Sequence, residues 1–156
     1  MHVHLVFVGK TNQPEVETAI QRYFQRLQHY FPTTIEVVKP EKITRKTAEE
    51  SVREAEGERI LKLVGNQGHL IVWDQRGRQL ESTELAQFWE ELVLSGHKTV
   101  WMVIGGPLGI SGRLLQRAHT VLSLSKMTFP HDLARLLVVE QLYRAATILK
   151  GEPYHK

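Results

Sequence analysis

Cysteine is absent from the 156-residue chain, which excludes disulfide bonds, thiolate metal sites and cysteine nucleophiles. Long apolar runs are missing as well. Even the rich segment 133–149 carries Arg135, Glu140, Gln141 and Arg144, whereas a membrane-spanning helix needs about 20 consecutive apolar residues. The amino-terminal segment lacks the basic start and small-residue cleavage site of a secretory signal. We therefore expect a protein that is not embedded in a membrane, with a cytoplasmic location.

The composition is that of an ordinary globular protein. Apolar residues make up 42% of the chain and charged residues 24%, and the sequence contains neither a low-complexity tract nor an internal repeat. This length is enough to bury a core without a structural metal, so we expect residues 1–156 to form a single domain. The 20 Lys and Arg residues exceed the 17 Asp and Glu residues by three. Such a modest excess permits a nucleic-acid partner without establishing one.

Strand-like and helix-like patterns alternate along the chain. The sequence predicts five strands, at 3–8, 35–38, 70–73, 100–104 and 121–124. It predicts helices that begin near Pro14, Thr47, Ser82 and Ser111, and a last helix over 131–150. Thr47 and Glu50 have the spacing of a capping box, and residues 75–78 are typical of a loop. The alternation predicts an α/β fold whose mostly parallel sheet has helices on both faces.

Two of the predicted strands end in loops that a ligand could enter. The apolar run 100–104 stops at Gly105, and the strand at 121–124 leads into the loop 125–130. Parallel sheets bind ligands at the carboxyl ends of their strands, and glycines allow close approach to the backbone. We expect the loops after Trp73, Ile104 and Leu124 to be neighbours that form a binding site built largely from main chain.

Common nucleotide and metal motifs do not account for this site. Residues 8–12 contain one glycine where a dinucleotide motif needs three, and segment 105–111 lacks the lysine of a phosphate-binding loop. Asp74, at a strand end, resembles the phosphoacceptor of a receiver domain, but no acidic pocket accompanies the first strand. His2 and His4 have no evident third ligand, so no metal site is expected.

Several separate motifs occur in order along the chain: Ile104–Pro107 with Gly109, Leu122–His131, Arg135, Glu140–Ala145 and the ending Pro153–His155. Together they resemble the RlmH family, the ribosomal RNA large-subunit methyltransferases H of the SPOUT class. The similarity covers essentially the whole chain. It implies a trefoil-knotted α/β fold, in which the carboxyl-terminal part is threaded through a loop, and it implies a homodimer.

The resemblance also implies a reaction. The enzyme would use S-adenosyl-L-methionine to methylate a ring nitrogen of a pseudouridine in large-subunit ribosomal RNA, on the assembled ribosome and without a metal. The cofactor-binding positions that it implies are Trp73, Gly105, Leu124, Ser125, Lys126, Met127, Thr128 and Phe129. Trp73 stands where leucine is expected, and Leu108 where glutamate is common. The residues implied to orient the base are Arg144, Tyr154 and His155, with His131 and Arg135 as further candidates.

Other interpretations remain open. A non-catalytic ribosome-binding or assembly factor on the same fold is the alternative function. We expect the apolar stripe of the last helix, from Leu133 to Ala146, to be shared between the core and a dimer interface. Arg135 and Arg144 are expected to contact phosphate or base, because a planar guanidinium suits both. The basic residues expected to face RNA are Arg76, Arg78, Arg113, Arg117, Lys126, Arg135, Arg144, Lys150 and Lys156.

Overall fold

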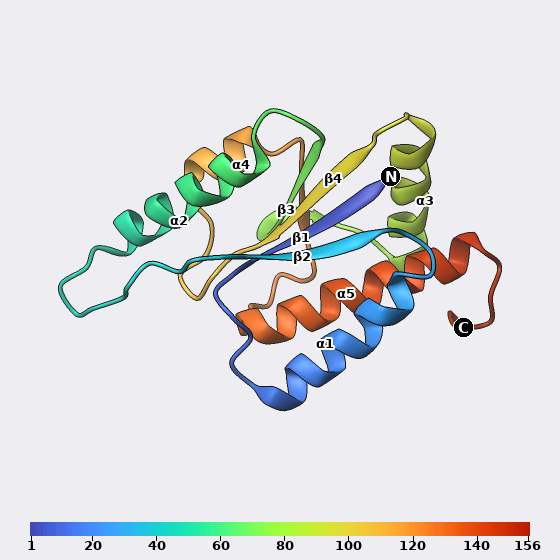
Figure 1. Ribbon diagram of the computed structural model, residues 1–156, viewed down its shortest axis with the longest axis horizontal. Helices are drawn as coiled ribbons and strands as arrows, with labels where there is room; N and C mark the ends of the chain where they lie inside the picture. Colours follow the sequence, from blue (N-terminus) through green and yellow to red (C-terminus); the bar gives the residue numbers. More distant parts are fainter.

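The computed structural model describes all 156 residues and contains one five-stranded parallel sheet (Figure 1). Its strands are β1 (His2–Val8), β2 (Thr33–Val38), β3 (His69–Gln79), β4 (Thr99–Ile104) and β5 (Thr120–Ser123), in the order β2-β1-β4-β3-β5. The helices are α1 (Pro14–Leu27), α2 (Glu49–Val64), α3 (Ser82–Leu94), α4 (Gly112–Arg117) and α5 (His131–Leu149). All four strand pairs are parallel, as predicted.

Each face of the sheet is covered by its own set of helices. In β1, Leu5 and Phe7 point into a core that α1, α3 and α5 close, while Val6 and Val8 point into a smaller core closed by α2 and α4. Alternation along a strand produces this division, because successive side chains point to opposite faces. Trp89 of α3 is the largest fully buried side chain. The predicted arrangement of helices on both faces is confirmed, and the threading of the chain through a loop stays a prediction.

β3 is longer than its sequence pattern predicts. The predicted loop 75–78 is wrong, because β3 continues to Gln79 and pairs with β5 again after a register shift between Trp73 and Arg78. A Cβ on Gly77 would lie 2.6 Å from the carbonyl carbon of Leu122, so only glycine allows this approach of two backbones. The extension is mostly exposed and carries no apolar alternation, which is why the sequence did not predict it.

The helix caps differ in part from expectation. The capping box predicted at Thr47 is wrong: α2 begins at Glu49, and the Thr47 hydroxyl lies 2.6 Å from the Thr44 hydroxyl instead. Only α3 has a capping box, in which Glu81 and Glu84 each bond the other's backbone N–H. The Ser111 side chain accepts a hydrogen bond from the backbone N–H of Leu114 at 3.2 Å and caps α4, as predicted.

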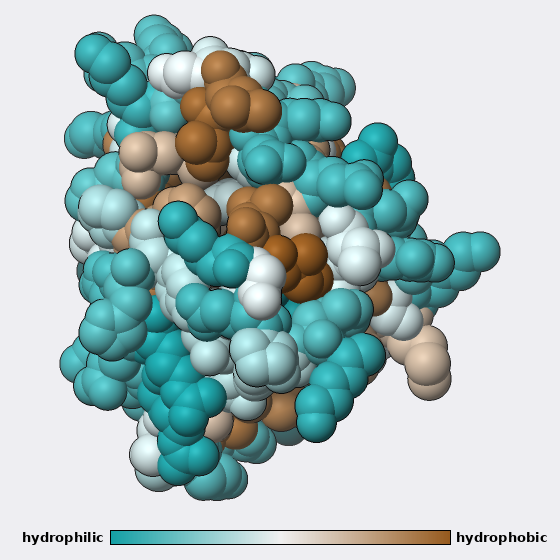
Figure 2. Space-filling view, turned by 90° about the vertical axis from the view of Figure 1, so that its right-hand side faces the viewer, coloured by the Kyte–Doolittle hydropathy of each residue, from teal (hydrophilic) through white to brown (hydrophobic).

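The amino ends of the strands carry two groups of histidines. His2, His4 and Trp101 stack on one another, and His69 lies against His97 and His119 at centroid distances of 5.1 and 5.0 Å. Figure 2 shows this side of the molecule, where hydrophilic residues predominate and hydrophobic residues form small separate groups. No three histidine or acidic side chains are placed to hold a metal ion together. None of the five helices has the length and apolar character needed to cross a membrane.

Acidification is expected to destabilise the protein through His69. Burial, followed by the charges of His119 and His97, lowers the pKa of His69 from 6.5 to about 4. Between these two values the unfolded chain binds more protons than the folded one, so stability falls as the pH drops from 6.5 toward 4. We expect the unfolding free energy to fall by about 1 kcal/mol through this residue between pH 7.5 and pH 5, allowing for partial solvent access to the ring.

Urea unfolding at the two pH values measures this effect. His69→Gln is expected to lose part of the pH dependence, whereas His29→Gln, at an exposed histidine outside both groups, is expected to keep it. An undiminished pH dependence in His69→Gln would show that the acid sensitivity originates elsewhere.

Candidate active site at the carboxyl ends of the strands

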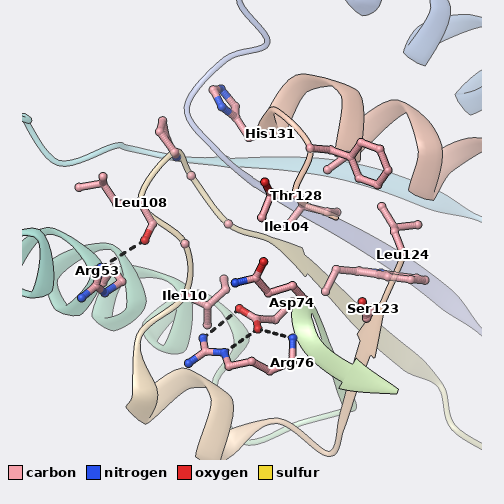
Figure 3. Close-up of a pocket in the computed structure, with 18 of the residues that line it drawn as sticks. Arg53, Asp74, Arg76, Ile104, Leu108, Ile110, Ser123, Leu124, Thr128 and His131 are labelled. Atoms are coloured by element: carbon pink, nitrogen blue, oxygen red, sulfur yellow. Dashed lines mark hydrogen bonds and ion pairs between the residues drawn. The ribbon is translucent and has the colours of Figure 1, made fainter. Parts of the chain in front are cut away.

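The loops after β4 and β5 meet the segment Trp73–Arg76 of β3 in a pocket of about 650 Å³ (Figure 3). β3 lies between β4 and β5, so Trp73, within β3, lies beside Ile104 and Leu122 near the ends of the two neighbouring strands. Ser123 is the last residue of β5. Trp73 and Ser123 line the pocket, together with the segment 104–112. The predicted proximity of the segments that follow Trp73, Ile104 and Leu124 is therefore confirmed, although the first of them is strand rather than loop. The volume is within the range of about 300–1,000 Å³ that is usual for small-molecule sites.

The loop after β4 folds back on itself along one side of the pocket. Gly106 and Gly109 form an isolated bridge, with the Gly109 N–H donating to the Gly106 carbonyl at 3.0 Å, and Gly109 has a φ of 87°. A Cβ on Gly105 would lie 2.7 Å from Ile110 Cδ1. Because Ile110 is only 5% exposed, it has little room to move aside. Glycine at 105 therefore keeps this wall open and its backbone accessible.

The segment between β5 and α5 forms the facing wall. The Ser123 hydroxyl donates to the Ser125 carbonyl at 2.9 Å, and the Met127 N–H donates to the Ser125 hydroxyl at 3.0 Å. These bonds turn the chain sharply after the strand. Met127 and Phe129, which border the pocket, remain 76% and 41% exposed. They offer apolar surface to a ligand or to a second chain.

Charged side chains border the rest of the pocket. Asp74 accepts hydrogen bonds from Nε, Nη2 and the backbone N–H of Arg76 at 2.7, 3.0 and 2.9 Å (Figure 3). The hydrogen bond from the Arg76 side chain is the main cause that lowers the pKa of Asp74. From α2, Arg53 donates to the Leu108 carbonyl at 3.4 Å. The pocket thus combines backbone and apolar walls with a fixed carboxylate.

Most of the residues expected to bind the cofactor are brought together here. Trp73, Gly105, Leu124, Ser125, Met127, Thr128 and Phe129 all line the pocket, whereas Lys126 does not. The Trp73 indole Nε1 is buried without a hydrogen-bond partner. Glu50, Arg53 and Glu54 of α2 also line the pocket, and sequence reasoning missed them. Nothing in the α2 sequence marks these residues, because helix packing alone brings them to the site.

The residues expected to orient the base form a second cluster, away from the pocket. Arg144 bonds Glu140 Oε1 through Nε at 3.1 Å and Nη2 at 2.5 Å, and its Nη1 lies 3.3 Å from His155 Nδ1. The Tyr154 hydroxyl donates to the same Glu140 oxygen at 3.0 Å, and Arg144 lies over the Tyr154 ring. The three predicted residues therefore gather around Glu140, which belongs to one of the family motifs but was not among the predicted site residues.

This cluster has defined protonation states. Burial, followed by hydrogen bonds with Tyr23 and Glu140, raises the pKa of Tyr154. A hydrogen bond to Glu152 raises the pKa of the neighbouring Tyr30 to about 12. The hydrogen bond to Glu140 also raises the pKa of Arg144. At neutral pH, Tyr154 is a hydrogen-bond donor and Arg144 is a cation, so neither is suited to remove a proton.

His131 and Arg135, the further candidates, lie near the start of α5. His131 lines the pocket, and burial followed by the charge of Arg135 lowers its pKa. Arg135 is 0% exposed, so the expectation that it contacts RNA is wrong. It donates to the Val8 carbonyl at 2.6 Å and to the Thr11 hydroxyl at 3.1 Å, which ties α5 to the end of β1. Arg135 is therefore a structural residue.

Comparison with known proteins agrees with this combination of fold and pocket. Residues 1–155 match the family described as Predicted SPOUT methyltransferase. A probable methylase family protein from Haemophilus influenzae Rd KW20 has a similar fold, with a TM-score of 0.60 at 14% identity over 99% of this chain and 70% of that one. A probable methyltransferase from Bordetella pertussis Tohama I gives 0.57 at 11% identity over 92% and 93%. These findings define a methyltransferase of the SPOUT class.

Sequence relatives identify the family within that class. Ribosomal RNA large subunit methyltransferase H of Syntrophobacter fumaroxidans is 60% identical over 100% of both chains. The protein of the same name from Christiangramia forsetii is 42% identical over 99% of both. The chain belongs to the family of ribosomal RNA large subunit methyltransferases H.

Proposed function

We propose that this protein transfers a methyl group from S-adenosyl-L-methionine to a ring nitrogen of a pseudouridine in large-subunit ribosomal RNA. The observation that carries the proposal is the pocket of about 650 Å³, which seven of the eight residues implied by the family resemblance line. The relatives' name supports ribosomal RNA as the substrate. Since that RNA is part of the ribosome, we propose a cytoplasmic location and action by residues 1–156 as one domain.

The pocket suits the proposed methyl donor. Leu124, Met127 and Phe129 supply apolar surface for an adenine ring, and the buried indole Nε1 of Trp73 lacks a partner that a ligand would provide. The open cradle at Gly105 lets a ligand reach the main chain. S-adenosyl-L-methionine, when bound, would supply an electrophilic methyl group. Methyl transfer of this kind needs alignment of donor and acceptor rather than a metal or a covalent intermediate.

The proposed role of the Glu140 cluster is to hold and polarise the target base. A pseudouridine ring nitrogen must lose its proton, and negative charge develops on the ring as it does so. Arg144 is a permanent cation and Tyr154 stays protonated, so both would stabilise that charge. Glu140 accepts from both side chains and fixes their separation. His155, beside Arg144, would complete the contact with the base.

Within one chain, this cluster is far from the pocket. Arg144 follows His131 by 13 residues on α5, which is about 20 Å at the helical rise per residue. Figure 1 shows the carboxyl terminus beyond the far end of α5, away from the start of that helix, where His131 lines the pocket. We therefore propose a homodimer, in which Arg144, Tyr154 and His155 of one subunit serve the pocket of the other. The exposed Leu133 and Leu137 of α5, and Phe129 next to them in the chain, supply apolar surface for that interface.

Calorimetric titration with S-adenosyl-L-methionine tests the proposal. Wild-type protein is expected to bind. Gly105→Ala is expected to weaken binding by about tenfold, because the added methyl clashes with the confined Ile110 and distorts this wall of the pocket. Gln87→Ala, at an exposed position of α3 outside the pocket, is the control and is expected to bind like the wild type. No detectable binding of S-adenosyl-L-methionine to the wild-type protein at millimolar concentration would contradict the proposed methyltransferase function. If ribosome binding persisted, that result would favour the non-catalytic assembly factor.

A further inference from the structure

The segment between β2 and α2, residues 39–48, is a strongly basic and exposed loop, which we name the β2–α2 loop. It carries Lys39, Lys42, Arg45 and Lys46, all of them exposed. Ile43, between them, is 51% exposed. None of these four basic residues is among those predicted from the sequence to face RNA. The loop thus contains four of the 20 Lys and Arg residues of the chain within eight positions.

The four cations have no internal partner. No carboxylate lies within 4.0 Å of any of them, whereas the seven ion pairs of the structure involve other basic residues. The one acidic residue within the loop, Glu41, is already paired with Arg59 of α2. The loop therefore presents uncompensated positive charge to solvent.

Specific bonds hold the loop in shape. The buried carboxylate of Glu56 accepts from the backbone N–H of Glu41 at 3.0 Å, and Arg59 donates to the Lys39 carbonyl at 3.0 Å. Farther out, the Thr47 N–H donates to the Thr44 carbonyl at 3.2 Å, which makes a turn. These bonds fix the backbone that carries the four cations, so less ordering is needed when the loop binds a partner.

The loop lies on the same side of the molecule as the pocket. It follows the carboxyl end of β2 and projects as the cyan to teal segment at the left of Figure 1, beside the start of α2. The first turns of α2 supply Glu50, Arg53 and Glu54 to the pocket wall. A Cβ on Gly106 would lie 3.3 Å from Glu56 Oε1, so the residue that anchors the loop also touches the pocket loop. A large substrate that reaches the pocket from this side also meets the loop.

We propose that the β2–α2 loop binds the phosphate backbone of the substrate RNA next to the target nucleotide, with Ile43 packing on an exposed sugar or base. This inference rests on the proposed function. Exposed unpaired Lys and Arg side chains bind phosphates by releasing counterions, and such contacts position a protein without reading sequence. The loop therefore gives each subunit a continuous basic surface. The arginines elsewhere on the chain are scattered and do not form such a surface.

Neutralising the loop tests the proposal. In Lys42→Gln/Arg45→Gln/Lys46→Gln, the KM for ribosomes lacking the modification is expected to rise by about tenfold or more. The slope of the logarithm of the binding constant against the logarithm of the salt concentration is expected to become smaller in magnitude by about two. The matched control is Arg22→Gln/Lys62→Gln/Lys98→Gln, which removes the same charge from exposed positions on other surfaces. It is expected to keep both values close to those of wild type. Equal effects of the two variants, or no effect of either, would overturn the proposal.

Two further measurements separate the possible causes. S-adenosyl-L-methionine binding is expected to be unchanged in the loop variant, so a lack of cofactor binding by wild-type protein would count against the proposed function rather than against the loop. A photo-crosslinking amino acid in place of Ile43 is expected to label ribosomal RNA in the protein–ribosome complex. Labelling of ribosomal protein alone would overturn RNA as the partner.

Discussion

Arg144→Ala is expected to lower kcat/KM for methyl transfer by about 100-fold or more, because it removes the cation that stabilises charge developing on the base. Glu140 would keep its hydrogen bonds with Tyr154 and Gln141, and His155 would lose its contact with the guanidinium. Arg144 is partly exposed on α5, so its loss is expected to change the unfolding free energy by no more than about 1 kcal/mol. Kinetics on ribosomes that lack the modification measure the first effect, and thermal unfolding measures the second.

Arg144→Lys is the control that separates charge from geometry. It keeps the positive charge and loses the planar fork that bonds Glu140 through two nitrogens. It is expected to recover part of the lost activity, while S-adenosyl-L-methionine binding stays unchanged in both variants. Full activity in Arg144→Ala would remove this residue from the reaction.

Arg135→Ala is expected to have the opposite consequence, a large loss of stability. Arg135 is fully buried, bonds the Val8 carbonyl at 2.6 Å, lies over the Phe7 ring and is 3.8 Å from Asp132. Its removal leaves the Asp132 carboxylate buried with less compensation, a change that costs about 3–5 kcal/mol in comparable cases. For a chain of this length we expect the melting temperature to fall by about 10 °C.

Chemical unfolding of Arg135→Ala gives this free energy directly. Asp132→Asn is the companion variant, because the amide oxygen can still accept from the backbone N–H groups of Asn12 and Gln13, which the carboxylate binds at 2.9 and 3.1 Å. It is expected to lose less stability than Arg135→Ala. A change below about 1 kcal/mol in Arg135→Ala would be typical of a surface arginine and would contradict the structural role.

The fold and the place of the pocket could be predicted because both depend on local pattern. Alternating apolar runs defined the strands, and glycine after a buried strand marked the loop at Gly105. Parallel strands bring such loops to one edge whatever separates them in sequence. This is why Trp73, Gly105 and Leu124, from three distant segments, line one pocket.

The remaining features depend on contacts that the sequence does not display. Arg135 and Arg144 look alike in the sequence, and only the packing of α5 against β1 shows that one is buried and the other available. The α2 side of the pocket, with Arg53, results from packing rather than from a motif. The exposed end of β3 lacks alternating apolar residues, so no strand was predicted there. Its close approach to the backbone of β5 depends on Gly77, which has no Cβ.

Mass spectrometry of ribosomal RNA from cells with and without this protein tests the central claim most directly. We predict that one pseudouridine of the large-subunit RNA carries a methyl group on a ring nitrogen only when the protein is present. Purified protein with S-adenosyl-L-methionine is expected to restore that methyl group to ribosomes from the cells that lack it. Identical methylation patterns in the two strains, together with no methyl transfer to ribosomes by purified protein, would contradict the account.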